Sequence, residues 1–154
     1  GEDAMKRFRL MWNDVAYQPG ELQVVAYNAD GKAVAEKTIR TSGKAAAIKL
    51  TPDRTVLKAD GEDLCFVNVS LTDKDGNPVP VDNRLVKVKV SGAGSFKAIA
   101  NGDPTCLQSF QEPQMNLFSG QLTVLVQSGT APGEITVEVS GKGVRKATMK
   151  IKTE

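Results

Sequence analysis

Apolar and polar residues alternate along most of this chain, and turn-forming residues separate the alternating runs. Residues 85–90 (LVKVKV) place valines on one face of a strand and lysines on the other, and residues 135–139 (ITVEV) follow the same period of two. Stretches such as DKDGNPVP, NGDP and GTAPG carry the Gly, Pro, Asn and Asp residues typical of turns. No window of about a dozen residues has helical spacing. The pattern predicts an all-β antiparallel sandwich or barrel.

One stretch of the chain occurs twice. Residues 19–41 read PGELQVVAYNADGKAVAEKTIRT, and residues 132–153 read PGEITVEVSGKGVRKATMKIKT. Each copy starts with Pro-Gly-Glu, continues as an alternating strand, passes a Gly-containing turn and returns to a Thr. An apolar run precedes each copy, FRLMWNDVAY in the first and FSGQLTVLVQS in the second. The repeat predicts the same three-strand ending of a sandwich, formed twice.

The two copies differ in what precedes them. Residues 48–90 supply further alternating strands before the second copy, whereas little precedes the first. We therefore expect residues 46–154 to form a β-sandwich domain and residues 1–45 to form the truncated end of another. A sheet of about three strands is only marginally stable alone. Its apolar face is expected to pack on the second domain or to self-associate with another copy of the chain.

Charge and composition exclude several classes of function. The 20 basic and 18 acidic side chains leave a net charge of +2, without the basic stripe and interleaved aromatics of a nucleic-acid-binding surface. No run approaches the ~18 apolar residues of a membrane-spanning helix. The chain has no His, which excludes Ser-His-Asp and Cys-His sites within it and removes the commonest metal ligand. We expect no cofactor, no metal, no nucleic-acid partner and no membrane span.

The two cysteines allow two interpretations. Cys65 and Cys106 fit no zinc-binding spacing. Lying about forty residues apart, they could bridge the two sheets of a sandwich, provided that their Cα atoms lie close enough. Cys65 also shares the parity of Val67, Val69 and Leu71, which favours a small core residue with a free thiol.

Both halves of the sequence resemble parts of one enzyme family. The start resembles the end of the small β-sandwich domain that follows the catalytic barrel in glycoside hydrolase family 2 enzymes. The stretches LKADGEDLCFVNVSLTDKDGNPVP and NGDPTCLQSFQEPQMNLFSG resemble the C-terminal immunoglobulin-like domain of β-galactosidase-type members. The residues that match the first pattern are Trp12, Tyr17, Pro19, Gly20, Leu22, Gly31, Lys32, Thr41 and Gly43.

The resemblance implies that the parent protein is a glycosidase and that this fragment has no catalytic activity of its own. The family's paired carboxylates lie on an eight-stranded α/β barrel of about 250 residues, for which this chain has no counterpart. The chain is thus expected to be a non-catalytic accessory domain that contacts the parent's catalytic domain, with an oligosaccharide as a further candidate partner. The family also implies a periplasmic or secreted protein. A start at GEDAMKRFRL, without Met or an apolar leader, is expected of a piece cut from a longer chain.

Three residues are candidates for contact with a sugar. Trp12 offers an aromatic face, although a core or interface position is the favoured alternative. Asn101 and Asp103 lie in the long irregular excursion at residues 101–120, where such side chains more often satisfy their own backbone. Within this excursion, Phe110, Leu117 and Phe118 are expected to hold the loop against the sandwich edge.

Two acidic patterns are predicted to have neither a metal-binding nor a catalytic role. Residues 73–77 (DKDGN) lack the spacing and the distal Glu of a calcium loop, so a hairpin turn is predicted. Nothing in the sequence places Glu112 and Glu134 the ~5–9 Å apart that glycoside hydrolysis requires. No catalytic residue is therefore predicted.

Two alternative functions remain open on the sequence. A carbohydrate-binding module would need exposed aromatic side chains, and only 5% of the residues are aromatic. An adhesin-like tandem of immunoglobulin-like surface domains would share the ADGEDLCFVNVSLTDKDGNPVP pattern. Further sandwich repeats upstream would distinguish the adhesin from the glycosidase.

Overall fold

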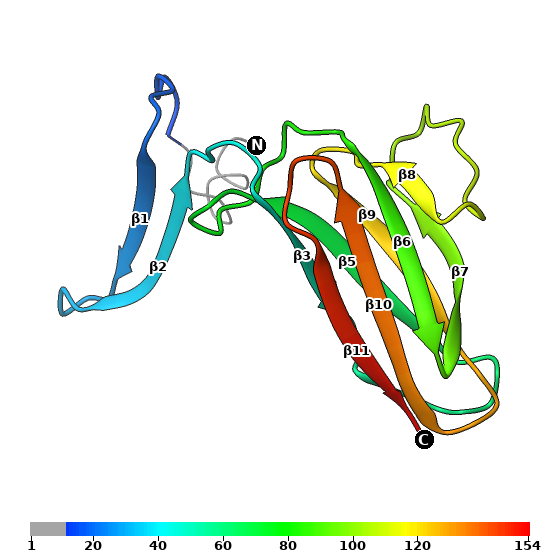
Figure 1. Ribbon diagram of the computed structural model, residues 1–154. Coiled ribbons are helices and arrows are strands. Elements are labelled where there is room, and N and C mark those ends of the chain that lie inside the picture. Colours follow the sequence, from blue (N-terminus) through cyan, green and yellow to red (C-terminus); the bar gives the residue numbers. More distant parts are fainter. Residues whose placement is uncertain (1–11) are drawn as a thin grey trace. The chain divides into compact units, whose positions relative to one another are not determined.

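The computed structural model describes residues 12–154 and divides the chain into two compact units, Gly1–Thr41 and Ser42–Glu154 (Figure 1). The division falls between Thr41 and Ser42, whereas the sequence suggested a boundary after residue 45. All regular structure in the described residues is β-strand. Accordingly, none of the described residues belongs to a helix long and apolar enough to cross a membrane.

The first unit contains one antiparallel hairpin. Strand β1 (Glu21–Tyr27) pairs with β2 (Ala33–Arg40), and the pairing register shifts by a bulge after Ala26. The side chain of Asn28 closes the turn, because its Oδ1 accepts hydrogen bonds from the backbone amides of Asp30 (3.1 Å) and Lys32 (2.9 Å).

The third strand expected before this hairpin is not found in the described residues. Residues 12–17 form no strand, and the rest of the predicted run, residues 8–11, lies outside the described part of the chain. Asp14 has a φ of 63°, a left-handed conformation that interrupts an extended strand. The apolar run at residues 12–17 therefore does not mark a strand.

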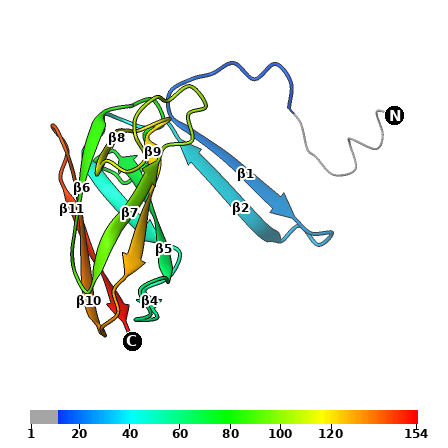
Figure 2. The ribbon, with the colours of Figure 1, turned by 90° about the vertical axis from the view of Figure 1, so that its right-hand side faces the viewer.

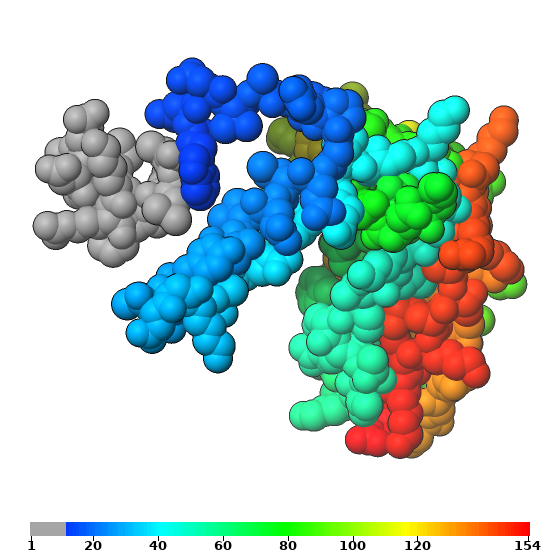
Figure 3. Space-filling model, turned by 90° about the vertical axis from the view of Figure 1, so that its left-hand side faces the viewer, coloured from blue at the N-terminus to red at the C-terminus, as the bar shows by residue number. Residues whose placement is uncertain are grey.

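The second unit is a sandwich of two sheets, seen nearly edge-on in Figure 2. One sheet has the strand order β4-β11-β10-β6-β8, and the other has the order β3-β5-β9-β7. All pairings are antiparallel except the short parallel pair of β4 with β11, where residues in the fifties lie against the C-terminal strand (Figure 3). The all-β sandwich prediction is confirmed. The strands are β3 (Ala47–Pro52), β4 (Val56–Leu57), β5 (Leu64–Thr72), β6 (Leu85–Gly92), β7 (Gly94–Ala100), β8 (Gln114–Asn116), β9 (Gln121–Ser128), β10 (Gly133–Gly141) and β11 (Ala147–Thr153).

The core lies between the two sheets and consists almost entirely of the inward positions of the alternating runs. Burial of these aliphatic side chains drives the closure of the sandwich, at about 25 cal/mol per Å² of apolar surface. Cys65 is fully buried among them, as its parity predicted. Fully buried positions include Cys65, Val67 and Val69 of β5, Val124 and Val126 of β9, and Ile135, Val137 and Val139 of β10.

The sequence repeat is also a structural repeat. In the second unit, β10 and β11 form a hairpin in which Gly133 lies opposite Thr153 and Ile135 opposite Ile151. In the first unit, β1 pairs with β2 so that Leu22 lies opposite Ile39. Counted from the shared Pro-Gly-Glu start and the shared Thr end, Leu22 corresponds to Ile135 and Ile39 to Ile151. The two copies therefore share both pattern and register.

Candidate functional site

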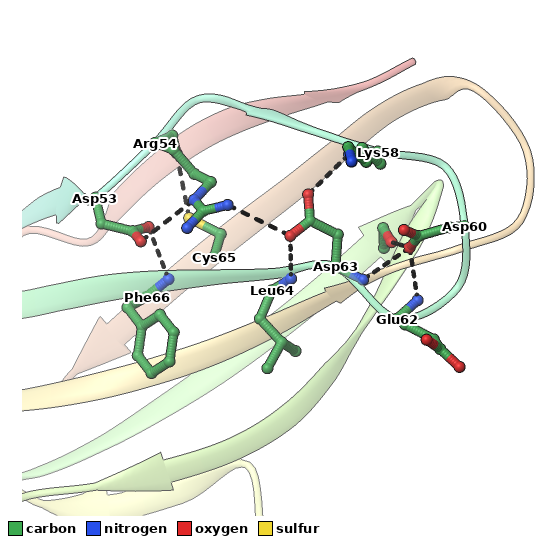
Figure 4. Close-up of polar contacts among 10 residues, drawn as sticks. Asp53, Arg54, Lys58, Asp60, Glu62, Asp63, Leu64, Cys65 and Phe66 are labelled. Carbon is green, nitrogen blue, oxygen red and sulfur yellow. Dashed lines mark hydrogen bonds and ion pairs between the residues drawn. The ribbon is translucent and has the colours of Figure 1, made fainter.

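A group of charged side chains lies in the loops between β3 and β5 (Figure 4). Asp53 directly follows the end of β3 at Pro52 and accepts a hydrogen bond from Phe66 N at 2.9 Å. Arg54 lies between two carboxylates, 3.4 Å from Asp53 Oδ2 and 3.4 Å from Asp63 Oδ1. Partial burial raises the pKa of Asp53, but the hydrogen bond from Phe66 and the charge of Arg54 outweigh it and leave that pKa below the ordinary value.

The ADGEDL motif forms the tip of this loop cluster. Asp60 Oδ1 accepts hydrogen bonds from the amides of Glu62 (2.9 Å) and Asp63 (2.8 Å), which lower the pKa of Asp60. Asp63 in turn accepts from Lys58 N and Leu64 N, both at 2.9 Å. These carboxylates satisfy loop amides before β5 starts. They do not form a metal cage, and no group of three or more His, Cys, Asp or Glu side chains among residues 12–154 is placed to hold an ion.

Cys65 is a buried thiol beside this cluster. Its Sγ lies 3.2 Å from the carbonyl oxygen of Arg54 and donates to it. Burial is the main cause that raises the pKa of the thiol, to about 11. Cys65 and Cys106 are both free, so the disulfide interpretation is wrong and the core interpretation is confirmed. A buried, protonated thiol is a poor nucleophile.

The excursion at residues 101–120 is held by its own hydrogen bonds. Asn101 Nδ2 donates to Asn116 O at 2.9 Å, and Asn101 Oδ1 accepts from Asp103 N at 3.0 Å. Asp103 Oδ1 accepts from both the amide (2.8 Å) and the hydroxyl (2.7 Å) of Thr105, and these bonds lower the pKa of Asp103. Gly102 has a φ of 76°, as the Asn-Gly turn requires. Both candidate side chains are therefore engaged by the loop, and their contact with a sugar stays a prediction.

The apolar residues of this loop divide into two groups. Leu117 is buried in the core, as expected of a residue that holds the loop to the sandwich. Phe110 and Phe118 are 55% and 40% exposed, so their part in holding the loop stays a prediction. Backbone hydrogen bonds hold the loop at both residues, Ile99 N to Phe110 O at 2.8 Å and Phe118 N to Gln121 O at 2.9 Å.

Trp12 is 63% exposed. This exposure refers to the 154-residue chain alone. A core or interface position in the first sandwich and a role as a sugar platform both stay predictions.

The turn at residues 73–77 is a hairpin turn built around one carboxylate, as predicted. Asp73 is only 4% exposed. Its Oδ1 accepts from the amides of Asp75 (2.9 Å) and Asn77 (2.8 Å), and its Oδ2 accepts from Gly43 N (2.9 Å) and Asn77 Nδ2 (3.1 Å). The bond from Gly43 is the largest of the causes that lower the pKa of Asp73 to about 2. Local pattern alone revealed the turn but not the bond to Gly43, which is thirty residues away in sequence.

An open groove lies beside this turn. The residues that line it include Gly43, Lys44, Val81, Arg84 and Lys142. Arg84 Nε donates to Asp82 Oδ1 at 2.9 Å and Arg84 Nη1 donates to Lys142 O at 2.7 Å. The pairing lowers the pKa of Asp82 and raises that of Arg84. Asp82, the one carboxylate among the groove-lining residues that the structure describes, is thus committed to an ion pair and not available to protonate a leaving group.

Comparison with known proteins identifies the family. The family model described as Glycoside hydrolase family 2 C-terminal domain 5 matches residues 48–150, and a domain of unknown function (DUF4982) matches residues 1–35. The chain therefore belongs to glycoside hydrolase family 2, as its sequence resemblance indicated.

Individual relatives agree with this assignment. Beta-galactosidase BoGH2A of Bacteroides ovatus is 41% identical over 140 residues, which are 91% of this chain and 16% of that protein. A beta-galactosidase of Thermoanaerobacter pseudethanolicus is 28% identical over 154 residues, 99% of this chain and 19% of that protein. A crystal structure of a family 2 member from Bacteroides cellulosilyticus is 31% identical with a TM-score of 0.85, and the match covers 96% of this chain and 20% of that chain. The chain spans less than a fifth of the length of these two curated relatives.

Proposed function

We propose that residues 1–154 form a non-catalytic accessory part of a larger family 2 glycoside hydrolase that hydrolyses O-glycosyl bonds as a β-galactosidase. Two relatives named beta-galactosidase support the activity of the whole protein. The small share of each relative that this chain covers leaves ample length for a catalytic domain elsewhere. Its partner would be the catalytic domain of the same enzyme, and the family resemblance favours a periplasmic or secreted location.

The protonation state of the aspartate side chains is the observation that supports the non-catalytic role. A glycosidase acid must hold a proton near neutral pH, so its pKa has to be raised. Here Asp53, Asp60, Asp73, Asp82 and Asp103 all have lowered pKa values. In the last four of these, hydrogen bonds to the carboxylate are the largest cause. They are ionised acceptors that hold loops, which is a structural task.

The full-length enzyme provides the test. We expect it to hydrolyse an aryl β-galactoside, and we expect the Asp103→Asn and Asn101→Ser variants to keep kcat within about threefold. Loss of a true acid or base costs a factor of about 10²–10⁴. A loss of that size in either variant, with KM unchanged, would contradict the non-catalytic assignment. No hydrolysis of galactosides by the full-length chain would contradict the proposed activity.

Exposed aromatic side chains favour one alternative, a carbohydrate-binding module. Trp12 and Phe66 are 63% and 44% exposed, and Phe66 lies on the outer face of β5 two residues from Asn68. Calorimetric titration of the 154-residue chain with galactose-containing oligosaccharides distinguishes the two functions. Saturable heat that disappears in Phe66→Ala or Trp12→Ala would favour the binding module, and no heat would favour the accessory role.

A further inference from the structure

A very short stretch of backbone connects the two compact units. Thr41 is the last residue of the first unit, and both its amide and its hydroxyl are hydrogen-bonded to Gly20. Gly43 belongs to the second unit, and its amide donates to Asp73 Oδ2 at 2.9 Å. Only Ser42 lies between these two bonded residues. We call Thr41, Ser42 and Gly43 the joint.

The chain after Gly43 is next held at Ala46. The amide of Ala46 donates to Thr72 O at 2.8 Å, and its carbonyl oxygen accepts from Arg145 N at 2.9 Å. The two backbone amides between Gly43 and Ala46 make no hydrogen bond with another residue in the described range 12–154. Without the bond at Gly43, the unbonded stretch would therefore extend over residues 42–45.

The bond at Gly43 sets the reach of the joint. An extended chain spans at most about 3.3–3.6 Å per residue, so the Cα atoms of Thr41 and Gly43 can lie at most about 7 Å apart. If the bond were lost, the same limit would apply to Thr41 and Ala46 and would rise to about 17 Å. Three further residues would then be free to rotate about φ and ψ.

The two carboxylate oxygens of Asp73 have different tasks. Oδ1 accepts from the amides of Asp75 and Asn77 and so closes the turn on which Asp73 itself lies. Oδ2 accepts from Gly43 N and from Asn77 Nδ2. Because the side chain is buried and its other oxygen is fixed by the turn, Oδ2 is a rigid acceptor for the joint.

We propose that Asp73 is a positioning residue that shortens the joint to one unbonded residue, Ser42. Its hydrogen bond with Gly43 N fixes the point at which the sandwich begins, and so limits the motion that the connecting backbone allows between the two units. The inference goes beyond the accessory role. It does not depend on the activity of the full-length protein, because all of these bonds lie within the 154-residue chain.

The Asp73→Asn variant removes this bond selectively. The orientation of Asn that keeps both turn bonds to its Oδ1 places the amide nitrogen opposite Gly43 N, so that a donor faces a donor. Asn77→Ala is the matched control, because it removes the other side-chain bond to Oδ2 and leaves the bond from Gly43. Gly43→Ala is a second control, since it keeps the amide and its Cβ would lie 3.7 Å from Asp73, an ordinary contact.

Backbone NMR of the ¹⁵N-labelled 154-residue chain provides the test. The heteronuclear NOE reports picosecond-to-nanosecond motion at each amide, and hydrogen exchange reports local opening. In the unsubstituted chain, we expect a lowered NOE within residues 41–46 only at Ser42. The Gly43 amide should exchange at least about tenfold more slowly than its intrinsic rate predicts.

In Asp73→Asn, the lowered NOE should spread over residues 42–45, and the protection of the Gly43 amide should be lost. Both controls should match the unsubstituted chain. The NOE values of β5 and β9 should stay unchanged in all variants, which separates a loosened joint from a general loss of stability.

Other outcomes overturn the proposal. A lowered NOE over residues 42–45 in the unsubstituted chain, or an unprotected Gly43 amide there, would show that the bond does not hold the joint, and neither result requires a variant that folds. Mobility confined to Ser42 in Asp73→Asn would show that another part of the chain holds the joint. Equal loosening in Asn77→Ala would assign the effect to the turn as a whole and not to the bond between Asp73 and Gly43.

Discussion

Gly20 and Thr41 hold the open end of the first hairpin by two hydrogen bonds, Thr41 N to Gly20 O at 2.8 Å and Gly20 N to Thr41 Oγ1 at 3.1 Å. The second hairpin ends on the corresponding pair, where the Thr153 hydroxyl is 3.3 Å from Gly133 O and 3.2 Å from Ala131 O. The Pro-Gly-Glu and Thr residues that define the sequence repeat are thus the residues that clamp each hairpin. What differs is the surroundings, because Thr153 is buried and Thr41 is exposed.

This difference predicts unequal costs for the same substitution in the two hairpins. Ile151→Ala removes a fully buried side chain and is expected to lower the free energy of unfolding of the 154-residue chain by about 2–5 kcal/mol. Ile39→Ala, at the corresponding but 61% exposed position, is expected to change it by less than about 0.5 kcal/mol. Urea denaturation measures both. Equal costs would show that the first hairpin already has a core in this chain.

A glycine at a close backbone approach provides the second prediction. Gly92 has a φ of 95°, and a Cβ there would lie 2.1 Å from Glu134 O on the neighbouring strand. Gly76 has a similar φ of 84°, with open space around its Cβ position. Gly76→Ala is expected to cost about 1–2 kcal/mol for the left-handed backbone alone. Gly92→Ala adds the clash with β10 and is expected to cost at least about 3 kcal/mol. Similar thermal stabilities for the two variants would mean that β6 and β10 can separate without penalty.

The third prediction concerns pH. The pKa of Asp73 is lowered to about 2 in the folded protein, against about 3.9 for an unperturbed Asp. Because the unfolded chain binds this proton first, Asp73 stabilises the fold above about pH 4, and that contribution is lost as the pH falls from about 4 to about 2. Asp73→Asn should therefore lower the Tm at pH 7 by about 5 °C or more and flatten its fall at acid pH.

Asp75 is a suitable control for this measurement. It is exposed, and its side chain accepts no hydrogen bond among the residues that the structure describes. Asp75→Asn should reproduce the acid profile of the unsubstituted chain. If Asp73→Asn also reproduced the acid profile of the unsubstituted chain, the hydrogen bond from Gly43 N to Asp73 would not stabilise the fold.

The features that the sequence revealed are those set by local chemistry. Alternation placed Val86, Val137 and Cys65 in the core correctly, and Asn-Gly and Asp-Gly pairs marked the turns. The same alternation failed at residues 12–17, because a pattern of side chains does not show where the backbone turns left-handed, as it does at Asp14.

Contacts between distant residues were not visible in the sequence. Nothing local distinguishes Asp73 as the acceptor for Gly43 N, or Arg54 as the link between Asp53 and Asp63. The free cysteines were undecided for the same reason, since spacing along the chain does not give the distance between two Cα atoms. For the candidate site, the sequence found the loop at residues 101–120 and favoured bonds from its Asn and Asp side chains to the local backbone, but it did not show the bond from Asn101 to the more distant Asn116 O.

The account depends most on the absence of glycosidase chemistry in these 154 residues, and an assay of the 154-residue chain on an aryl β-galactoside tests it directly. We predict release of the aryl group at the rate of buffer alone, with the full-length enzyme active under the same conditions. An enzymatic rate from the 154-residue chain, abolished by replacement of one of its carboxylates, would contradict it.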